Sequence, residues 1–221
     1  MALALINPTL ACADRMYLGR DVDTLTELGA ELFHIDIMDG HYVPNLCFDF
    51  DTILAIKQHS SVPLDIHLMV DQPFDYLERA AALQPRYISY HLNATPFPLR
   101  MADQIKARNI KAGVVLNPID RVDSLGHLLP LLDMVQLMGV EPGFAGQRFI
   151  ESTVTKVKQL NKLRQEKNLS FLISVDGGIN GKTGKECAIN GADILIAGAL
   201  AIFGQDVPLR QAYFNFRAAV G

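Results

Sequence analysis

Cysteine is scarce in this sequence, and it does not occur in pairs. Cys12, Cys47 and Cys187 are widely separated, and none of them belongs to a Cys-x-x-Cys motif. An odd number of isolated cysteines argues against a disulfide framework. We therefore expect free thiols and a reducing compartment.

Long apolar runs, basic runs and a signal peptide are also missing. No apolar stretch approaches the roughly 20 residues that a membrane-spanning helix needs. Residues 1–13 are apolar, but they lack a basic region, and Asn7-Pro8 interrupts them. The formal net charge of −4 gives no reason to expect nucleic acid or an anionic membrane as a partner. We expect a cytoplasmic protein that holds any anionic substrate through backbone N–H groups, helix N-termini or a metal.

No linker rich in Gly, Ser or Pro divides the 221 residues, and the composition does not shift along them. The length fits a single α/β barrel, for which roughly 200–250 residues are typical. Apolar residues make up 49% of the chain, which is enough for a large core. The sequence therefore predicts one domain over residues 1–221.

Short apolar runs rich in β-branched residues recur at intervals of about one helix and two loops. Between them, apolar residues have helical spacing, and a last helix is predicted over Pro208–Ala219. Strict alternation predicts right-handed parallel βαβ units. Eight such units predict an α/β fold of the closed (β/α)₈ TIM barrel type, because open sheets usually have about five or six strands. The predicted strands are Leu3–Asn7, Leu32–Met38, Leu64–Met69, Arg86–His91, Lys111–Leu116, Asp133–Met138, Phe171–Val175 and Ala192–Ala197.

The second predicted strand has a polar face. His34, Asp36 and Met38 alternate with three apolar residues, so they share one side of the strand. In a barrel, the apolar side packs against the outer helices and the other side points into the lumen. A buried Asp or His is costly unless it is paired or bound to a metal.

The third and seventh strands repeat this pattern. His67 points the same way on the third strand, and Asp176 ends the seventh. All these residues lie at the carboxyl ends of strands, where barrels place their active sites. A single inward His is more often a hydrogen-bonded core residue, but three strands carry the pattern at one level. We predict that His34, Asp36, His67 and Asp176 hold one divalent metal ion, and this set suits Zn, Fe, Mn or Co better than Ca or Mg.

Small residues follow the last three predicted strands, in Pro142–Gln147, Gly177-Gly178 and Gly198-Ala199. Such residues let backbone amides approach an anion closely, and loops after strands seven and eight are the usual phosphate site of this fold. Each glycine pair alone is also an ordinary turn, but their joint placement favours a phosphate site. The longer Pro142–Gln147 loop could also act as a lid.

Methionine is the last residue of three predicted strands. Met38, Met69 and Met138 could be ordinary gap-fillers of the core. They could also form a water-poor wall of the active site, beside the reacting carbons. Both interpretations stay open at this point.

Four segments resemble the signature segments of the ribulose-phosphate 3-epimerase family. They are residues 34–45 (HIDIMDGHYVPN), 65–70 (DIHLMV), 140–147 (VEPGFAGQ) and 175–178 (VDGG). The similarity runs from Asn7 to Gly198 in the family's order and spacing. It implies a barrel of the phosphate-binding, ribulose-phosphate-binding type that inverts C3 of a phosphorylated ketose. It also implies a homo-oligomer, either a dimer or a hexamer.

The resemblance gives the site residues roles. It implies that Asp36 and Asp176 are metal ligands, with His34 and His67, and also the acid–base pair. A metal on the C2 carbonyl and C3 hydroxyl oxygens would stabilise a cis-enediolate, while one Asp removes a proton and the other returns one to the opposite face. The substrate and phosphate contacts that it implies are Thr9, His67, Gly143, Phe144, Ala145, Gly146, Gly177, Gly178, Gly198 and Ala199.

Several positions depart from the family pattern. Ala145 and Ala199 replace a more usual Gly and Ser, and Asn93 stands where a Glu often follows the fourth-strand His. The Gly198–Phe203 segment is one residue longer. This segment and the Pro142–Gln147 loop are similar to those of D-allulose-6-phosphate 3-epimerase. Conversion of D-ribulose 5-phosphate to D-xylulose 5-phosphate, a pentose phosphate reaction, is our first expectation, and D-allulose 6-phosphate is the alternative substrate.

Barrels of this kind also carry two other functions. Orotidine-phosphate decarboxylases use an Asp-x-Lys-x-x-Asp motif, but Asp36-Ile-Met-Asp39 has neither the Lys nor the spacing. A non-catalytic sugar-phosphate sensor would be favoured by the loss of a metal ligand or a carboxylate, and none is lost. A metal-dependent epimerase therefore remains the expected function.

Overall fold

The strands of the protein form a closed barrel. The computed structural model describes residues 4–221, and its nine strands have the order β1-β9-β8-β7-β6-β5-β4-β2-β3. A parallel bridge between Thr9 and His34 joins β1 to β2 and closes the ring. The strands are β1 Leu5–Pro8, β2 Phe33–Asp39, β3 Leu46–Cys47, β4 Leu64–Met69, β5 Tyr87–His91, β6 Lys111–Leu116, β7 Met134–Met138, β8 Leu172–Asp176 and β9 Ile194–Ala197.

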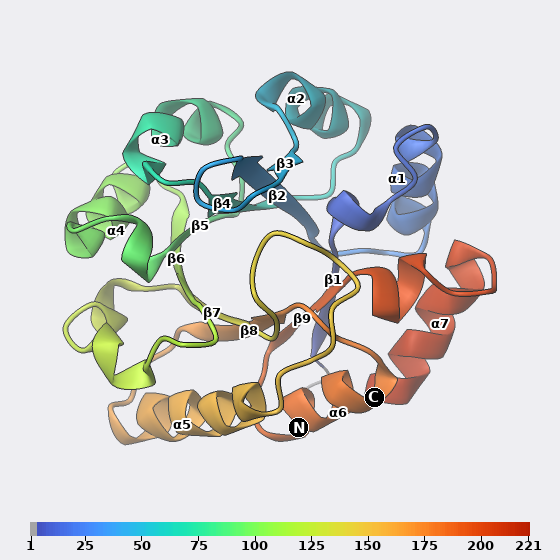
Figure 1. Ribbon diagram of the computed structural model, residues 1–221. Helices are drawn as coiled ribbons and strands as arrows, with labels where there is room; N and C mark the ends of the chain where they lie inside the picture. The colour runs from blue at the N-terminus through green and yellow to red at the C-terminus, as the bar shows by residue number, and fades with distance from the viewer. Residues whose placement is uncertain (1–3) are drawn as a thin grey trace.

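Helices surround this ring on its outer side (Figure 1). The α-helices are α1 Leu18–Glu27, α2 Phe50–His59, α3 Pro73–Ala82, α4 Pro98–Lys106, α5 Ser152–Glu166, α6 Gly181–Ile189 and α7 Leu209–Val220. Shorter turns are the 3₁₀ helices η1 Leu10–Cys12, η2 Leu92–Ala94, η3 Val122–Leu125 and η4 Leu129–Leu131, and the π-helix η5 Ala199–Phe203. Within residues 4–221, no helix is long and apolar enough to cross a membrane.

The predicted TIM barrel is confirmed. The expected strands Leu64–Met69 and Lys111–Leu116 have the observed bounds, and the other expected strands differ by one or two residues at one or both ends. Leu3, the first residue of the first predicted strand, lies outside the described residues. The last helix begins and ends one residue later than predicted, at Leu209 and Val220.

Two features differ from a regular alternation of strand and helix. The two-residue strand β3 pairs antiparallel with the end of β2 and so closes the loop of residues 40–45 between them. No α-helix joins β6 to β7, where the chain forms η3 and η4 instead. Pro118, Gly126 and Pro130 interrupt this connection, and such residues break a continuous helix.

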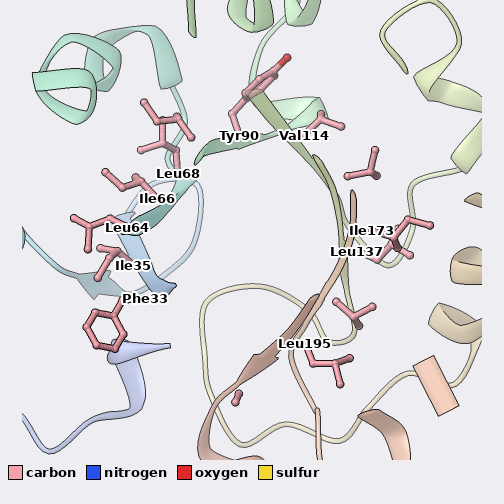
Figure 2. Packing of buried hydrophobic residues seen from close by; sticks show 14 of the residues in the cluster. Phe33, Ile35, Leu64, Ile66, Leu68, Tyr90, Val114, Leu137, Ile173 and Leu195 are labelled. Carbon is pink, nitrogen blue, oxygen red and sulfur yellow. The ribbon is translucent and has the colours of Figure 1, made fainter. Parts of the chain in front are cut away.

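The outer face of the barrel wall is apolar, as the alternation predicts. Side chains such as Phe33, Ile35, Ile66 and Leu195 point away from the lumen and pack under the helices (Figure 2). Each of these four side chains is fully buried. Burial of a large aliphatic or aromatic side chain contributes roughly 1.5–3 kcal/mol to folding, so this layer stabilises the wall on which the inward residues stand.

The lumen changes character along the barrel axis. An apolar plug fills its lower part: Leu32, Tyr87, Met134 and Ile194 lie at the amino ends of the strands, and Ile196, further along β9, reaches the cavity wall. Above the plug lies a buried polar layer, and the carboxyl ends of the strands carry the predicted ligands. The barrel is therefore sealed at one end and open to a ligand at the other.

Close packing of the lumen can be tested at Gly113 on β6. A Cβ added there would overlap Ser89 Oγ and come within 3.3 Å of Met134 Cε. Overpacking of a core typically costs 1–3 kcal/mol, and roughly 2–4 °C of Tm is lost per kcal/mol in a chain of this size. We expect Gly113→Ala to lower the Tm by about 2–12 °C in thermal unfolding. Gly19→Ala is the control, because the nearest atom to its added Cβ lies 4.0 Å away, and an unchanged Tm in Gly113→Ala would contradict the packing argument.

Candidate functional site

Four side chains from three strands meet at the open end of the lumen. His34 Nε2 lies 3.3 Å from Asp36 Oδ1 and 3.7 Å from Asp176 Oδ2. His67 Nδ1 lies 3.3 Å and 3.6 Å from the same two oxygens. One ligand atom from each residue falls within 4.8 Å of all the others. The structure thus brings together the four residues that the sequence singled out.

These distances fit a single transition-metal ion. Nitrogen and oxygen ligands about 2.1 Å from a tetrahedral ion lie about 3.4 Å from one another, close to the spacings between His34 or His67 and the two carboxylates. His34 Nε2 is buried and has no hydrogen-bond partner among the described residues. A buried ring nitrogen aimed at two carboxylates, with no partner of its own, is what an absent cation would satisfy. The group could therefore hold a metal ion.

His34 is oriented from behind by a buried carboxylate. Its Nδ1 lies 2.8 Å from Asp65 Oδ2, which also accepts a hydrogen bond from Asn7 Nδ2 at 2.8 Å. Burial alone would lower the pKa of His34, but the Asp36 and Asp65 carboxylates raise it well above its usual value. A carboxylate behind a metal-binding His fixes its tautomer and makes the ring a stronger ligand.

The two carboxylates of the site have different partners. Asp36 Oδ2 accepts a 2.5 Å hydrogen bond from the Thr9 hydroxyl, and Asp176 Oδ2 accepts one of 3.3 Å from Gln136 Nε2. Burial would raise the pKa of Asp36, but the close His34 and His67 rings hold it well below its usual range. Asp36 is therefore ionised and ready to accept a cation.

His67 is held on both ring nitrogens. Gln136 Nε2 lies 3.1 Å from Nδ1, and His91 Nε2 lies 2.9 Å from Nε2. Burial would lower the pKa of His67, but the neighbouring Asp176 and Asp36 carboxylates raise it. Burial and the neighbouring His67 lower the pKa of His91 well below its usual value, so His91 is neutral.

A cavity opens above this cluster. Its wall includes Asp36, Asp176 and every predicted substrate contact except His67, namely Thr9, Gly143, Phe144, Ala145, Gly146, Gly177, Gly178, Gly198 and Ala199. Met38, Met69 and Met138 also line it. Of the two interpretations of these methionines, the structure favours the cavity wall.

The turn after β8 requires glycine. Gly177 and Gly178 have φ values of +95° and +68°. A Cβ on Gly178 would come within 2.6 Å of the Phe149 backbone, and one on Gly177 would overlap Val140. The turn therefore needs glycine for its backbone angles and its close packing, and both residues line the cavity. Glycine turns of this kind can offer N–H donors to an anion.

The loop between β7 and α5 crosses in front of the barrel mouth (Figure 1). Asn45 Nδ2 donates a 2.7 Å hydrogen bond to the Gly143 carbonyl, which ties this loop to the segment after β2. Phe144 is 53% exposed although it lines the cavity. The loop therefore covers part of the mouth, in agreement with a position for a lid.

Sequence reasoning missed the residues that support the ligands. Asp65, Gln136 and His91 contact them directly, and all three are fully buried. Their inward alternation on β4, β7 and β5 is a signal that could have found them. Arg15 and Asn45 also line the cavity, but they lie on loops whose path the sequence does not predict.

The three cysteines are free, as expected, and two of them border the cavity. Burial first, and then the charge of Asp36, raise the pKa of Cys12 to about 12 and that of Cys47 to about 11. Both thiols are therefore protonated near neutral pH and serve as small wall residues.

Solved structures with similar folds are other barrels. A thiamine phosphate pyrophosphorylase from Pyrococcus furiosus matches with a TM-score of 0.64 and 16% identity, covering 99% of this chain and 95% of that one. A tryptophan synthase from Mycobacterium tuberculosis matches with a TM-score of 0.70 and 12% identity, covering 99% and 93%. Identities this low carry the fold alone.

Sequence comparison is more specific. The model of the "Ribulose-phosphate 3 epimerase family" matches residues 5–203. A ribulose-phosphate 3-epimerase from Bacillus subtilis is 39% identical over 201 residues, which cover 90% of this chain and 92% of that protein. One from Treponema pallidum is 36% identical over 199 residues, which cover 90% and 91%. The chain belongs to the ribulose-phosphate 3-epimerase family.

Proposed function

We propose that this chain is a metal-dependent epimerase that inverts C3 of a phosphorylated ketose, D-ribulose 5-phosphate to D-xylulose 5-phosphate in the first instance. The observation that carries the proposal is the placement of Asp36 and Asp176. Both carboxylates lie in the wall of the cavity, and both have an oxygen within 3.7 Å of the His34 and His67 nitrogens. The names of the relatives support the same reaction.

The placement of the two carboxylates suits an inversion. Asp36 ends up on β2 and Asp176 on β8, and the strands β9 and β1 lie between them in the barrel wall. A planar substrate held between them would present one face to each. One carboxylate then removes the C3 proton, and the other delivers a proton to the opposite face. A single base would tend to return the proton to the side it came from.

His34, Asp36, His67 and Asp176 would hold one divalent ion, with Zn, Fe, Mn and Co as candidates. When bound, this ion supplies Lewis acidity and positive charge that stabilise the anion developing on the substrate. Thr9 keeps Asp36 in place through its hydroxyl, and Gln136 does the same for Asp176. The methionine wall formed by Met38, Met69 and Met138 keeps water away from the carbon that loses its proton.

The phosphate would lie against the turns after β8 and β9. Gly177 and Gly178 have no side chains of their own, and they line the same cavity as Gly198 and Ala199. Ala199 has no hydroxyl to donate, so backbone N–H groups carry this contact. Gly143, Phe144, Ala145 and Gly146 would cover the substrate from the lid loop.

One observation favours D-allulose 6-phosphate as the alternative substrate. The segment that is longer than in typical ribulose-phosphate epimerases forms a π-helix, in which Phe203 N donates to Gly198 O and Gly204 N to Ala199 O. A single π-turn accommodates one inserted residue in a helix, often at a functional site. This turn begins in the wall of the cavity, where a longer sugar would need a different phosphate position.

A side-by-side assay tests the proposal and its alternative. We expect purified, metal-loaded protein to epimerise ribulose 5-phosphate. Its rates on allulose 6-phosphate and xylulose 5-phosphate are measured under the same conditions. A higher kcat/KM on allulose 6-phosphate would select the six-carbon alternative. Absence of turnover on all three, in protein that binds a metal, would overturn the epimerase proposal in favour of a sugar-phosphate sensor.

The domain and its assembly belong to the same proposal. We take residues 1–221 as one barrel domain that forms a homo-oligomer, either a dimer or a hexamer. Size-exclusion chromatography with light scattering measures this state directly. A monomer at assay concentrations would contradict it.

A further inference from the structure

His91 ends β5 directly beside His67, and both side chains are fully buried. Their Nε2 atoms lie 2.9 Å apart, and their rings are stacked with centroids 4.9 Å apart. Two ring nitrogens at this distance share one hydrogen, so one ring donates and the other accepts. The place of that hydrogen decides which nitrogen of His67 is left bare.

Only one of the two arrangements leaves His67 able to bind a metal. If His67 donates from Nε2, its neutral ring has a bare Nδ1, which faces Asp36 and Asp176. If His91 donates instead, neutral His67 carries its hydrogen on Nδ1 and loses the lone pair that a metal needs. The partner at Nε2 therefore selects between a competent and a blocked ligand.

The polar groups around His91 favour the competent arrangement. The Tyr42 hydroxyl donates to Asn93 Oδ1 at 2.7 Å and accepts from Asn117 Nδ2 at 2.7 Å. These two hydrogen bonds orient the Asn117 amide. Asn117 Oδ1 and His91 Nδ1 are both buried, and neither has a hydrogen-bond partner among the described residues. Burial lowers the pKa of His91 and Asn117 opposes this effect, so the two side chains are neighbours, although no hydrogen bond joins them in this structure. A hydrogen bond between these two unpartnered atoms would keep the His91 hydrogen on Nδ1 and leave its Nε2 free to accept from His67.

We propose that His91 is a positioning residue that holds His67 in the tautomer with a bare Nδ1, and that Asn117 and Tyr42 hold His91 in turn. His34 has the Asp65 carboxylate in the corresponding place. A neutral ring behind His67 orients it without adding a further negative charge to the site. The inference rests on the proposed role of His67 as a metal ligand.

Two substitutions of His91 separate hydrogen bonding from packing. His91→Phe keeps a ring beside His67 but removes the acceptor, whereas His91→Gln keeps an acceptor oxygen. Loss of such a supporting partner typically costs roughly 10–100-fold in metal affinity. We expect His91→Phe to weaken Zn²⁺ binding by about that factor, in competition with a chelator, and His91→Gln to stay within a few-fold of the parent protein. His59→Gln, which changes an exposed His paired with Asp23, is the control.

The tautomer itself is measured in metal-free protein. At a pH above the raised pKa of His67, where its ring is neutral, nitrogen-15 spectra of the labelled histidines should show His67 protonated at Nε2 and bare at Nδ1 in the parent protein. Tyr42→Phe should show a mixture of tautomers. Parent protein with hydrogen on His67 Nδ1, or His91→Phe that folds and binds Zn²⁺ with parental affinity, would overturn the inference. If His91→Phe does not fold, an unchanged tautomer in Tyr42→Phe together with weak Zn²⁺ binding by His91→Gln would overturn it.

None of these measurements needs turnover. Protein that binds Zn²⁺ with the expected tautomer, but epimerises no sugar phosphate, would overturn the proposed function and leave the role of His91 intact. If the His91→Phe variant epimerises normally and its Zn²⁺ affinity is unchanged, the role of His91 is overturned and the proposed function stands.

Discussion

Asp176→Asn is expected to lower kcat for inversion at C3 by roughly 10²–10⁴-fold, the usual contribution of a positioned acid or base. Asparagine keeps the shape of the side chain but cannot accept a proton at neutral pH. Asp36→Asn should have an effect of the same order, because a two-carboxylate mechanism needs a group on each face. The measurement is the rate of epimerisation in protein with a verified metal content, since both residues belong to the proposed ligand set.

Exchange of the C3 hydrogen with solvent deuterium makes this experiment sharper. A variant that lacks one carboxylate can still exchange the proton on the face that the other carboxylate serves, but it cannot invert the centre. Any residual exchange should therefore favour one epimer in Asp36→Asn and the other in Asp176→Asn. Asp71→Asn is the matched control, because Asp71 is an exposed carboxylate just after β4 and does not line the cavity. Inversion at the parental rate in either variant, at equal metal content, would contradict the mechanism.

The barrel was predictable because its signals are local. Alternation on Leu32–Met38 places His34 and Asp36 on the inner face through geometry alone, and the same holds for His67 on β4. The carboxyl end of a parallel strand then brings these residues to one mouth, whichever loops connect them. For the same reason, the Gly177-Gly178 turn could be assigned to the cavity from the sequence.

The side chains that contact the four predicted ligand residues were not predictable in the same way. Alternation shows that His91 and Gln136 face inward, but which inward side chains touch depends on how far each strand is shifted against its neighbours around the ring. His91 reaches His67 because β5 pairs with β4 in the register His67 with Ser89, two residues before His91. The Asn45 contact to Gly143 depends in turn on β3, a two-residue strand that no pattern marks.

Removal of the metal should abolish epimerisation and lower the Tm. An ion at 100 times its Kd stabilises the folded state by about 2.7 kcal/mol, which corresponds to about 5–10 °C in a chain of this size. We expect chelator-treated protein to lose activity and recover it with Zn, Fe, Mn or Co, which also ranks these candidates. Full activity in protein verified to be metal-free would contradict the proposed function.

The gap in Tm between metal-bound and metal-free protein should widen as the pH rises. In the metal-free protein, the Asp36 and Asp65 carboxylates raise the pKa of His34, and Asp176 and Asp36 raise that of His67, each overcoming the opposite effect of burial. A His whose folded pKa is raised stabilises the protein below its unfolded pKa, and this contribution is lost as the pH rises through the folded value. A metal ion needs the same nitrogens unprotonated, so its affinity increases over that range. Thermal unfolding at pH 6 and pH 8.5, with and without metal, measures both trends. His59→Gln should preserve the widening of the Tm gap, and His34→Gln should remove most of the gap. A gap that narrows with rising pH would show that the ion does not bind at the nitrogens of His34 and His67.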